Sequence, residues 1–345
     1  MEHDTTMYRL FAEQASRRPD APLFELPDSA TITYGATSDI VHRIAARLVA
    51  DGVTPGDRVA AQVPKSPEAL ALYLATVQIG GVFLPLNVAY TDAEMRYFLT
   101  DARPRVLVCS PDRLEGYSEH QDSIVVETLG ANADGSLLSD DDRHVDVHDA
   151  ATDDPAAILY TSGTTGRSKG AVLTHGNLVS NCEALVEAWQ FTSEDRLIHA
   201  LPIFHVHGLF VAANMTIATG ASMHFLPTFD VETVLDLLPE STVLMGVPTF
   251  YTRLAGNERL TPELCASMRL FVSGSAPLLA ADHEIGERGL AGASTTRIAA
   301  RAGLSVGALY RFFHDKEEIA DALAARYLAA VAPTYADAVA GVASV

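Results

Sequence analysis

A loop rich in hydroxyl and glycine residues follows a short apolar run near the middle of the chain. The run, residues 156–160, has the length and composition of a buried strand. It is followed at 161–170 by Thr-Ser-Gly-Thr-Thr-Gly-Arg-Ser-Lys-Gly. Glycine lets the backbone approach a ligand closely, hydroxyl and N–H groups donate hydrogen bonds, and Lys169 adds positive charge. These residue types predict a polyphosphate site, although no Walker A spacing fits the loop.

Two further segments carry candidate chemistry. Residues 197–208 contain His205 and His207, and residues 270–278 contain Ser273-Gly-Ser-Ala. All three loops follow expected strands, and ligands of α/β sheets bind at the carboxyl ends of strands. The alternative for the glycine-rich loop is a surface turn, and the alternative for either histidine is an ordinary core or surface residue.

The glycine-rich loop resembles the phosphate loop of the adenylate-forming enzymes, the acyl-CoA synthetases and their relatives. The resemblance is to the malonyl-CoA synthetase branch, over residues 7–283, and includes segments 197–208, 245–251 and 270–278. Such enzymes activate a carboxylate with ATP, form an acyl-adenylate and pass the acyl group to a thiol. The resemblance implies ATP with Mg²⁺ as cofactor, CoA as co-substrate, and an α/β fold of layered subdomains for residues 1–283.

The resemblance also implies roles for individual residues. His205 matches the catalytic histidine beside the acyl-adenylate, and with His207 and Ser275 it would bind the acid substrate. The residues expected to bind ATP lie in two of the three loops: Thr161, Ser162, Gly163, Thr164, Thr165, Gly166, Lys169, Ser273, Gly274, Ser275 and Ala276. No metal-ligating set is expected among the residues of this chain.

The branch implies malonate or methylmalonate as substrate in preference to a fatty acid. A second carboxylate deep in a pocket needs a cation or a hydrogen-bond donor. Arg253 and Arg269 lie near matching segments, but a surface position explains both equally well.

Two parts of the family pattern are not found after residue 279. The family continues with a Tyr-Gly-x-Thr-Glu segment, whose glutamate holds Mg²⁺, and later with a lysine that drives adenylation. Residues 279–345 contain no Gly-x-Thr-Glu and no lysine in a Gly-Lys context. Metal and lysine stabilise developing phosphate charge by several kcal/mol. The ligase part is therefore expected to be truncated, with weak or absent adenylation by this chain alone.

The C-terminal region has a different pattern. Helices are expected at 295–302 and 306–313, with a turn between them and a third helix from Lys316, which is helix-turn-helix spacing. This region resembles the DNA-binding head of TetR-type regulators, and the resemblance implies DNA contacts from Thr296, Ser305, Tyr310 and Lys316. Residues 287–345 would then be a small all-α segment, and a DNA-binding regulator is the alternative function. The alternative for this region is a generic amphipathic helical tail.

Charge and cysteine usage limit the choice of partners. The formal net charge is −20, and because residues 287–345 hold six basic and six acidic groups, the excess lies in residues 1–286. This balance argues against non-specific nucleic-acid or membrane binding by the whole chain. Cys109, Cys182 and Cys265 are isolated, which predicts buried thiols in a reducing compartment, the cytoplasm. The uncharged run 208–226 predicts a core helix followed by a strand, and no membrane partner is expected.

The apolar periodicity predicts alternating helices and strands along most of residues 1–283. Such alternation is typical of an α/β fold with largely parallel sheets. Strands are expected at 30–34, 58–63, 82–86, 106–109, 124–126, 171–174, 197–201, 222–226, 243–247 and 270–272.

Overall fold

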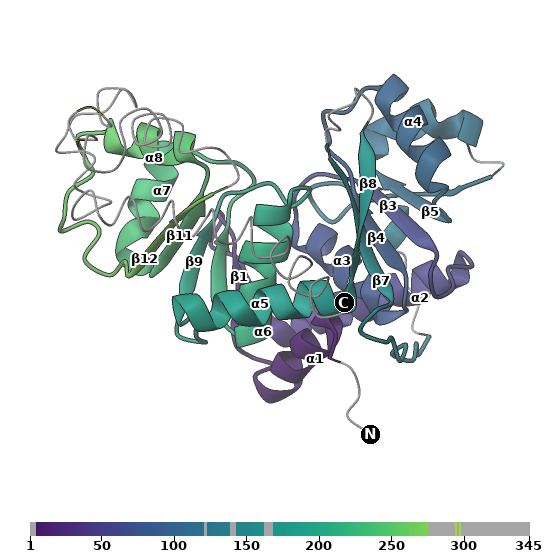
Figure 1. Ribbon diagram of the computed structural model, residues 1–345, viewed down its shortest axis with the longest axis horizontal. Helices are drawn as coiled ribbons and strands as arrows, with labels where there is room; N and C mark the ends of the chain where they lie inside the picture. The colour runs from purple at the N-terminus through teal and green to yellow at the C-terminus, as the bar shows by residue number, and fades with distance from the viewer. Residues whose placement is uncertain are drawn as a thin grey trace, which may run out of the picture. The chain divides into compact units, whose positions relative to one another are not determined.

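The chain divides into two compact units (Figure 1). The structure, a computed structural model, describes residues 5–120, 123–138, 143–161 and 168–274, together with 294 and 297. The first unit comprises Met1–Asp230 and Glu240–Met245, and the second comprises Val231–Pro239 and Gly246–Val345. The predicted domains, 1–283 and 287–345, have other limits and stay a prediction.

One sheet of the first unit has the strand order β6-β5-β3-β4-β7-β8. Its neighbours pair in parallel, except that β7 and β8 form an antiparallel pair. Parallel strands covered on both faces are apolar throughout, and β4 and β5 are buried at every position. The strands are β3 (Arg58–Gln62), β4 (Val82–Pro85), β5 (Val106–Cys109), β6 (Val125–Thr128), β7 (Pro155–Thr161) and β8 (Lys169–Thr174).

The other sheet has the order β11-β9-β10-β1-β2 within the first unit. All its pairs are parallel except β1 with β2. The sequence did not predict β1, because only Leu23 and Phe24 are buried apolar residues in its four positions. The strands are β1 (Pro22–Glu25), β2 (Thr31–Thr33), β9 (Arg196–His199), β10 (Ser222–Phe225) and β11 (Val243–Gly246).

Helix α3 (Pro67–Gln78) is buried along its whole length. Ser66 Oγ accepts from Ala69 N at 3.1 Å, and Pro67 occupies the first turn, so the helix begins with a side-chain cap and a residue that needs no N–H partner. It packs against α1, α2 and β4. A helix that is apolar on every face is stable only when it is covered on every face. The other helices of this unit are α1 (Met7–Arg17), α2 (Tyr34–Ala50), α4 (Asp92–Ala102), α5 (His175–Trp189) and α6 (Asn214–Thr219).

Several predictions from the sequence can be compared with this arrangement. The sequence Thr91-Asp-Ala-Glu94 has the spacing that predicts a capping box at the start of a helix, and the structure confirms it at the start of α4. The run 208–226 forms a π-helical segment (His207–Ala213), α6 and then β10, which confirms a helix followed by a strand. Within the part of the chain that the structure describes, no helix is long and apolar enough to cross a bilayer. Cys109 and Cys182 are buried as predicted, but the prediction was wrong for Cys265, which is half-buried.

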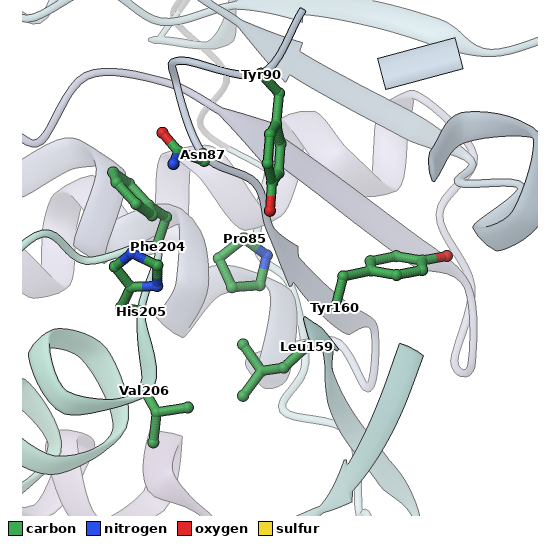
Figure 2. Close-up of a pocket in the computed structure, with 8 residues that line it drawn as sticks. All are labelled: Pro85, Asn87, Tyr90, Leu159, Tyr160, Phe204, His205 and Val206. Atoms are coloured by element: carbon green, nitrogen blue, oxygen red, sulfur yellow. The ribbon is translucent and has the colours of Figure 1, made fainter. Parts of the chain in front are cut away.

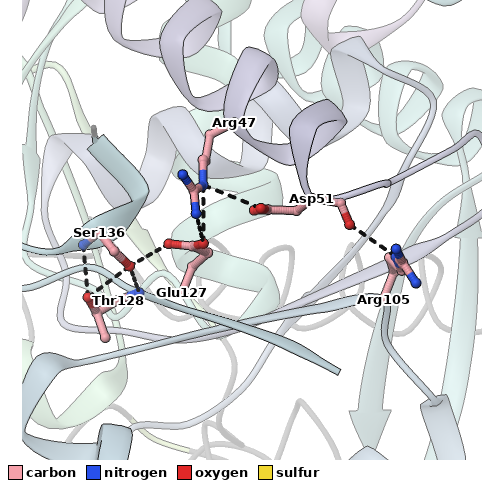
Figure 3. A network of polar contacts seen from close by, with 6 residues as sticks. All are labelled: Arg47, Asp51, Arg105, Glu127, Thr128 and Ser136. Atoms are coloured by element: carbon pink, nitrogen blue, oxygen red, sulfur yellow. Dashed lines mark hydrogen bonds and ion pairs between the residues drawn. The ribbon is translucent and has the colours of Figure 1, made fainter. Parts of the chain in front are cut away.

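A polar network holds α2 against the edge strand β6 (Figure 3). Arg47 Nε donates to Glu127 Oε1 at 3.1 Å, and Ser136 Oγ donates to the other carboxylate oxygen. Arg105 Nε donates to the carbonyl of Asp51, the residue after α2, at 3.1 Å. The Glu127 side chain is only 4% exposed, so these donors replace the water that it gives up.

The second unit contains α7 (Val231–Leu237), α8 (Pro248–Ala255) and β12 (Leu270–Ser273). Arg259 forms ion pairs with Glu232 and Asp236, both on α7. Tyr251 on α8 donates to the carbonyl of Val272 in β12 at 2.6 Å. These contacts join the elements of this unit to one another.

Candidate functional site

A pocket of the first unit lies where several strands end (Figure 2). Pro85 is the last residue of β4, Tyr160 lies at the end of β7, and His205 follows β9. This is where α/β sheets bind ligands. The full lining is Pro85, Asn87, Tyr90, Leu159, Tyr160, Phe204, His205 and Val206.

The pocket includes His205, the predicted catalytic residue. Its side chain is exposed, and its ring lies 4.6 Å from that of Phe204, centroid to centroid. Partial burial lowers the pKa of His205 below its ordinary value. At neutral pH the ring is therefore uncharged and can exchange a proton with a bound group, but it supplies no charge to it.

His207 does not line this pocket. It is the first residue of the π-helical segment, and only 6% of its surface is exposed. Burial lowers the pKa of His207 to about 4, and its Nδ1 has no hydrogen-bond partner among the described residues. The two histidines thus have different surroundings, and contact of His207 with a substrate carboxylate stays a prediction.

A buried lysine that the sequence analysis missed lies behind the pocket segment. Lys65 Nζ lies 2.9 Å from His199 Nδ1, 2.8 Å from His199 O and 2.6 Å from Leu226 O. His199 Nε2 lies 2.8 Å from the carbonyl of Gly208. A carbonyl only accepts, so Nε2 carries the proton, Nδ1 accepts, and Lys65 donates to all three partners.

This chain of hydrogen bonds links the ends of β9 and β10 to the first turn after the pocket segment 204–206. Burial lowers the pKa of Lys65 and of His199 well below their ordinary values. The three acceptors around Lys65 oppose that shift, because they stabilise the ammonium form. The only sequence signal was a lysine between the expected strand at 58–63 and the apolar helix α3, and its partners are 134 and 161 residues away.

The predicted phosphate-binding residues are described only at the two ends of their loop. Thr161 is the last residue of β7 and pairs with the exposed Lys169, the first residue of β8. Tyr160, next to Thr161, lines the same pocket as His205. The residues predicted between these ends lie outside the described residues: Ser162, Gly163, Thr164, Thr165 and Gly166.

The remaining predicted residues belong to the second unit. Ser273 is the exposed last residue of β12, and Gly274 N donates to Gly246 O at 3.0 Å. Arg253 and Arg269 are both exposed, as the surface interpretation expects. Ser275, Ala276, Thr296, Ser305, Tyr310 and Lys316 lie outside the described residues.

Comparison with known proteins identifies the family. The model of the family described as AMP-binding enzyme matches residues 11–289, most of the chain. The chain belongs to this family. The fold is that of its relatives, since the crystal structure of ATP-bound MatB from Rhodopseudomonas palustris is 50% identical, with a TM-score of 0.76 over 84% of this chain and 58% of that one.

Curated relatives extend the comparison. A feruloyl-CoA synthase from an Amycolatopsis species is 35% identical over 72% of this chain and 50% of its own. A malonate–CoA ligase from Arabidopsis thaliana is 34% identical over 66% of this chain and 42% of its own. The chain therefore spans about half the length of the curated relatives it matches.

A second family model matches the C-terminal region. The model described as bacterial regulatory proteins, tetR family, matches residues 278–323. This confirms the resemblance found in the sequence, although the match begins before the predicted boundary at residue 287. The two matches overlap at 278–289.

Proposed function

We propose that residues 1–283 are the nucleotide- and acid-binding part of an ATP-dependent carboxylate–CoA ligase of malonyl-CoA synthetase type. The observation that carries this proposal is the 50% identity, across 84% of the chain, to a MatB crystallised with ATP. The pocket at the strand ends, with His205 on one wall and Tyr160 on another, supports the proposal, because the acid and the nucleotide would bind side by side there.

The proposal assigns chemistry to particular residues. Lys169 and Thr161 would contact the triphosphate, with Lys169 offsetting its charge, and His205 would lie beside the reacting carboxylate. Mg²⁺ would accompany ATP and neutralise phosphate charge. Among the described residues no group of three or more His, Cys, Asp or Glu gathers as a metal site. CoA would be the acyl acceptor, and the reducing cytoplasm is the proposed location.

ATP binding is the first test. Calorimetric titration of the whole chain with Mg·ATP is expected to show weak binding. Lys169→Ala should weaken it about tenfold or more, because a hydrogen bond to a charged group contributes roughly 1.5–3 kcal/mol. Arg17→Ala is the matched control, since Arg17 is an exposed cation paired with Glu13 on α1. No heat at saturating ATP, with Lys169→Ala unchanged from the unaltered chain, would remove the support for this proposal.

The acid is tested in the same protein once a non-hydrolysable ATP analogue is bound. A ligand that binds only the folded state raises the melting temperature, so malonate, methylmalonate, octanoate and ferulate can be ranked by their shifts. Malonate or methylmalonate is expected to give the largest shift. A clear preference for octanoate or ferulate would contradict the choice of acid while leaving the ligase proposal in place.

DNA binding is a second candidate function, and the tetR-family match at 278–323 favours it. One recognition helix reads only a half-site, and a net charge of −20 opposes DNA. We therefore expect weak binding with little sequence preference. A gel shift at physiological salt against DNA flanking the gene tests this expectation. A sequence-specific complex at nanomolar protein, lost in Tyr310→Ala, would place regulation above the ligase function.

A further inference from the structure

Helix α4 lies beside both ends of the loop that follows β7. Tyr97 Oη donates to the carbonyl of Ser168 at 2.7 Å, on the β8 side of the loop. Tyr160 Oη donates to Asp101 Oδ2 at 2.6 Å, on the β7 side. Tyr97 and Asp101 are four residues apart, so they lie on one face of α4. A single helical turn thus contacts the residues that flank 161–167.

The helix is itself held firmly. Its N-terminus has a complete capping box, in which Thr91 N donates to Glu94 Oε2 at 2.8 Å. Met95, Phe98 and Leu99 are buried in the same core cluster as residues of β3, β4 and β5. A capped helix with a buried face is held against its sheet, and Tyr97 and Tyr160 both pack, partly buried, against the same cluster.

The contacts on the β7 side depend on close packing. The Tyr160 ring lies 4.5 Å from that of Phe98, centroid to centroid, and Gly170 pairs with Tyr160 across the ladder. A Cβ on Gly170 would come within 3.0 Å of Ile158 Cγ2 and 3.6 Å of Tyr160 Cε1. A side chain at this position would press on Ile158, whereas its distance from the Tyr160 ring would be ordinary van der Waals contact.

We propose that Tyr97 and Asp101 are positioning residues for ATP, which fix the two ends of the phosphate-binding loop through the Ser168 carbonyl and the Tyr160 hydroxyl. The inference rests on the proposed function, since it concerns the same nucleotide. Neither residue needs to touch ATP. The two bonds fix the positions at which β7 ends and β8 begins. The chain between these two strands then loses less conformational freedom when ATP binds to it.

The test compares ATP with AMP in calorimetric titrations of the full chain. Tyr97→Phe keeps the ring and removes one hydrogen bond, so the Kd for Mg·ATP should rise about 3- to 10-fold. Binding of AMP, which lacks the β- and γ-phosphates, should be unchanged. A role in general stability alone would not separate the two nucleotides.

Matched variants complete the experiment. Asp101→Ala should weaken ATP binding about 3-fold, a smaller effect because this carboxylate is exposed, and Asp101→Asn should restore it because the amide oxygen still accepts from Tyr160. Tyr8→Phe removes a tyrosine hydroxyl on α1, which lies 3.3 Å from His42 Nε2, and should bind ATP normally.

The outcomes separate this inference from the function on which it rests. Normal ATP affinity in both Tyr97→Phe and Asp101→Ala, with ATP binding intact in the unaltered chain, would overturn the positioning role alone. Equal weakening of ATP and AMP would overturn it as well. Failure of the unaltered chain to bind ATP would overturn the proposed function and this inference together.

Discussion

Replacing Glu127 with alanine is expected to lower the free energy of unfolding by about 2–4 kcal/mol, which is slightly less than the usual cost of breaking a fully buried ion pair. The Glu127 side chain is 4% exposed and that of Arg47 is 32% exposed, so water compensates the arginine in part. The substitution also leaves Ser136 Oγ without the carboxylate to which it donates. The edge strand β6 then loses its polar connection to α2 (Figure 3).

Trp189, the single tryptophan of the chain, lies on α5 in the first unit, so its fluorescence during urea unfolding reports on that unit. Glu127→Gln keeps an acceptor and removes the charge, and about half the loss is expected. Glu13→Ala breaks an exposed pair on α1 and should change the stability by no more than about 0.5 kcal/mol. If Glu127→Ala cost no more than Glu13→Ala, the network would contribute nothing measurable to the stability of this unit.

The sequence predicted local structure and the family, but it did not predict contacts between distant residues. The capping box at Thr91 and the strand 106–109 follow from spacing and apolar runs, which are properties of neighbouring residues. The phosphate loop was recognised because its residues match a known pattern, and the family match at 11–289 confirms that resemblance.

The features missed by the sequence analysis depend on the fold. The Lys65–His199 contact spans 134 residues and the Tyr97–Ser168 contact spans 71, and no periodicity encodes either. The π-helical segment after Val206 has no composition that separates it from an ordinary helix. Burial of all of α3 depends on the helices that cover it, because a helical pattern specifies only one buried face.

The burial of His207 should make the protein sensitive to mild acid. The folded-state pKa of about 4 lies below the ordinary histidine pKa of 6.5, so the unfolded chain takes up this proton first as the pH falls. The stability associated with His207 is complete above about pH 6.5 and is lost as the pH falls toward 4. At pH 5 the loss attributable to this residue should be about 2 kcal/mol.

The measurement is the change in unfolding free energy between pH 7 and pH 5, again from Trp189 fluorescence in urea. His207→Gln cannot take up this proton, so it should lose about 2 kcal/mol less than the unaltered chain over that interval, whatever it costs at pH 7. Buried histidines that do not interact with His207 titrate alike in both proteins and cancel; His199 does not belong to them, because a charged His207 lowers its pKa. His144→Gln is the control, because the His144 side chain is 87% exposed. Equal acid sensitivity in His207→Gln and the unaltered chain would mean that His207 is not held neutral by burial. It could then supply positive charge to a second substrate carboxylate, whereas the depressed pKa leaves it only a neutral hydrogen-bond donor or acceptor for malonate.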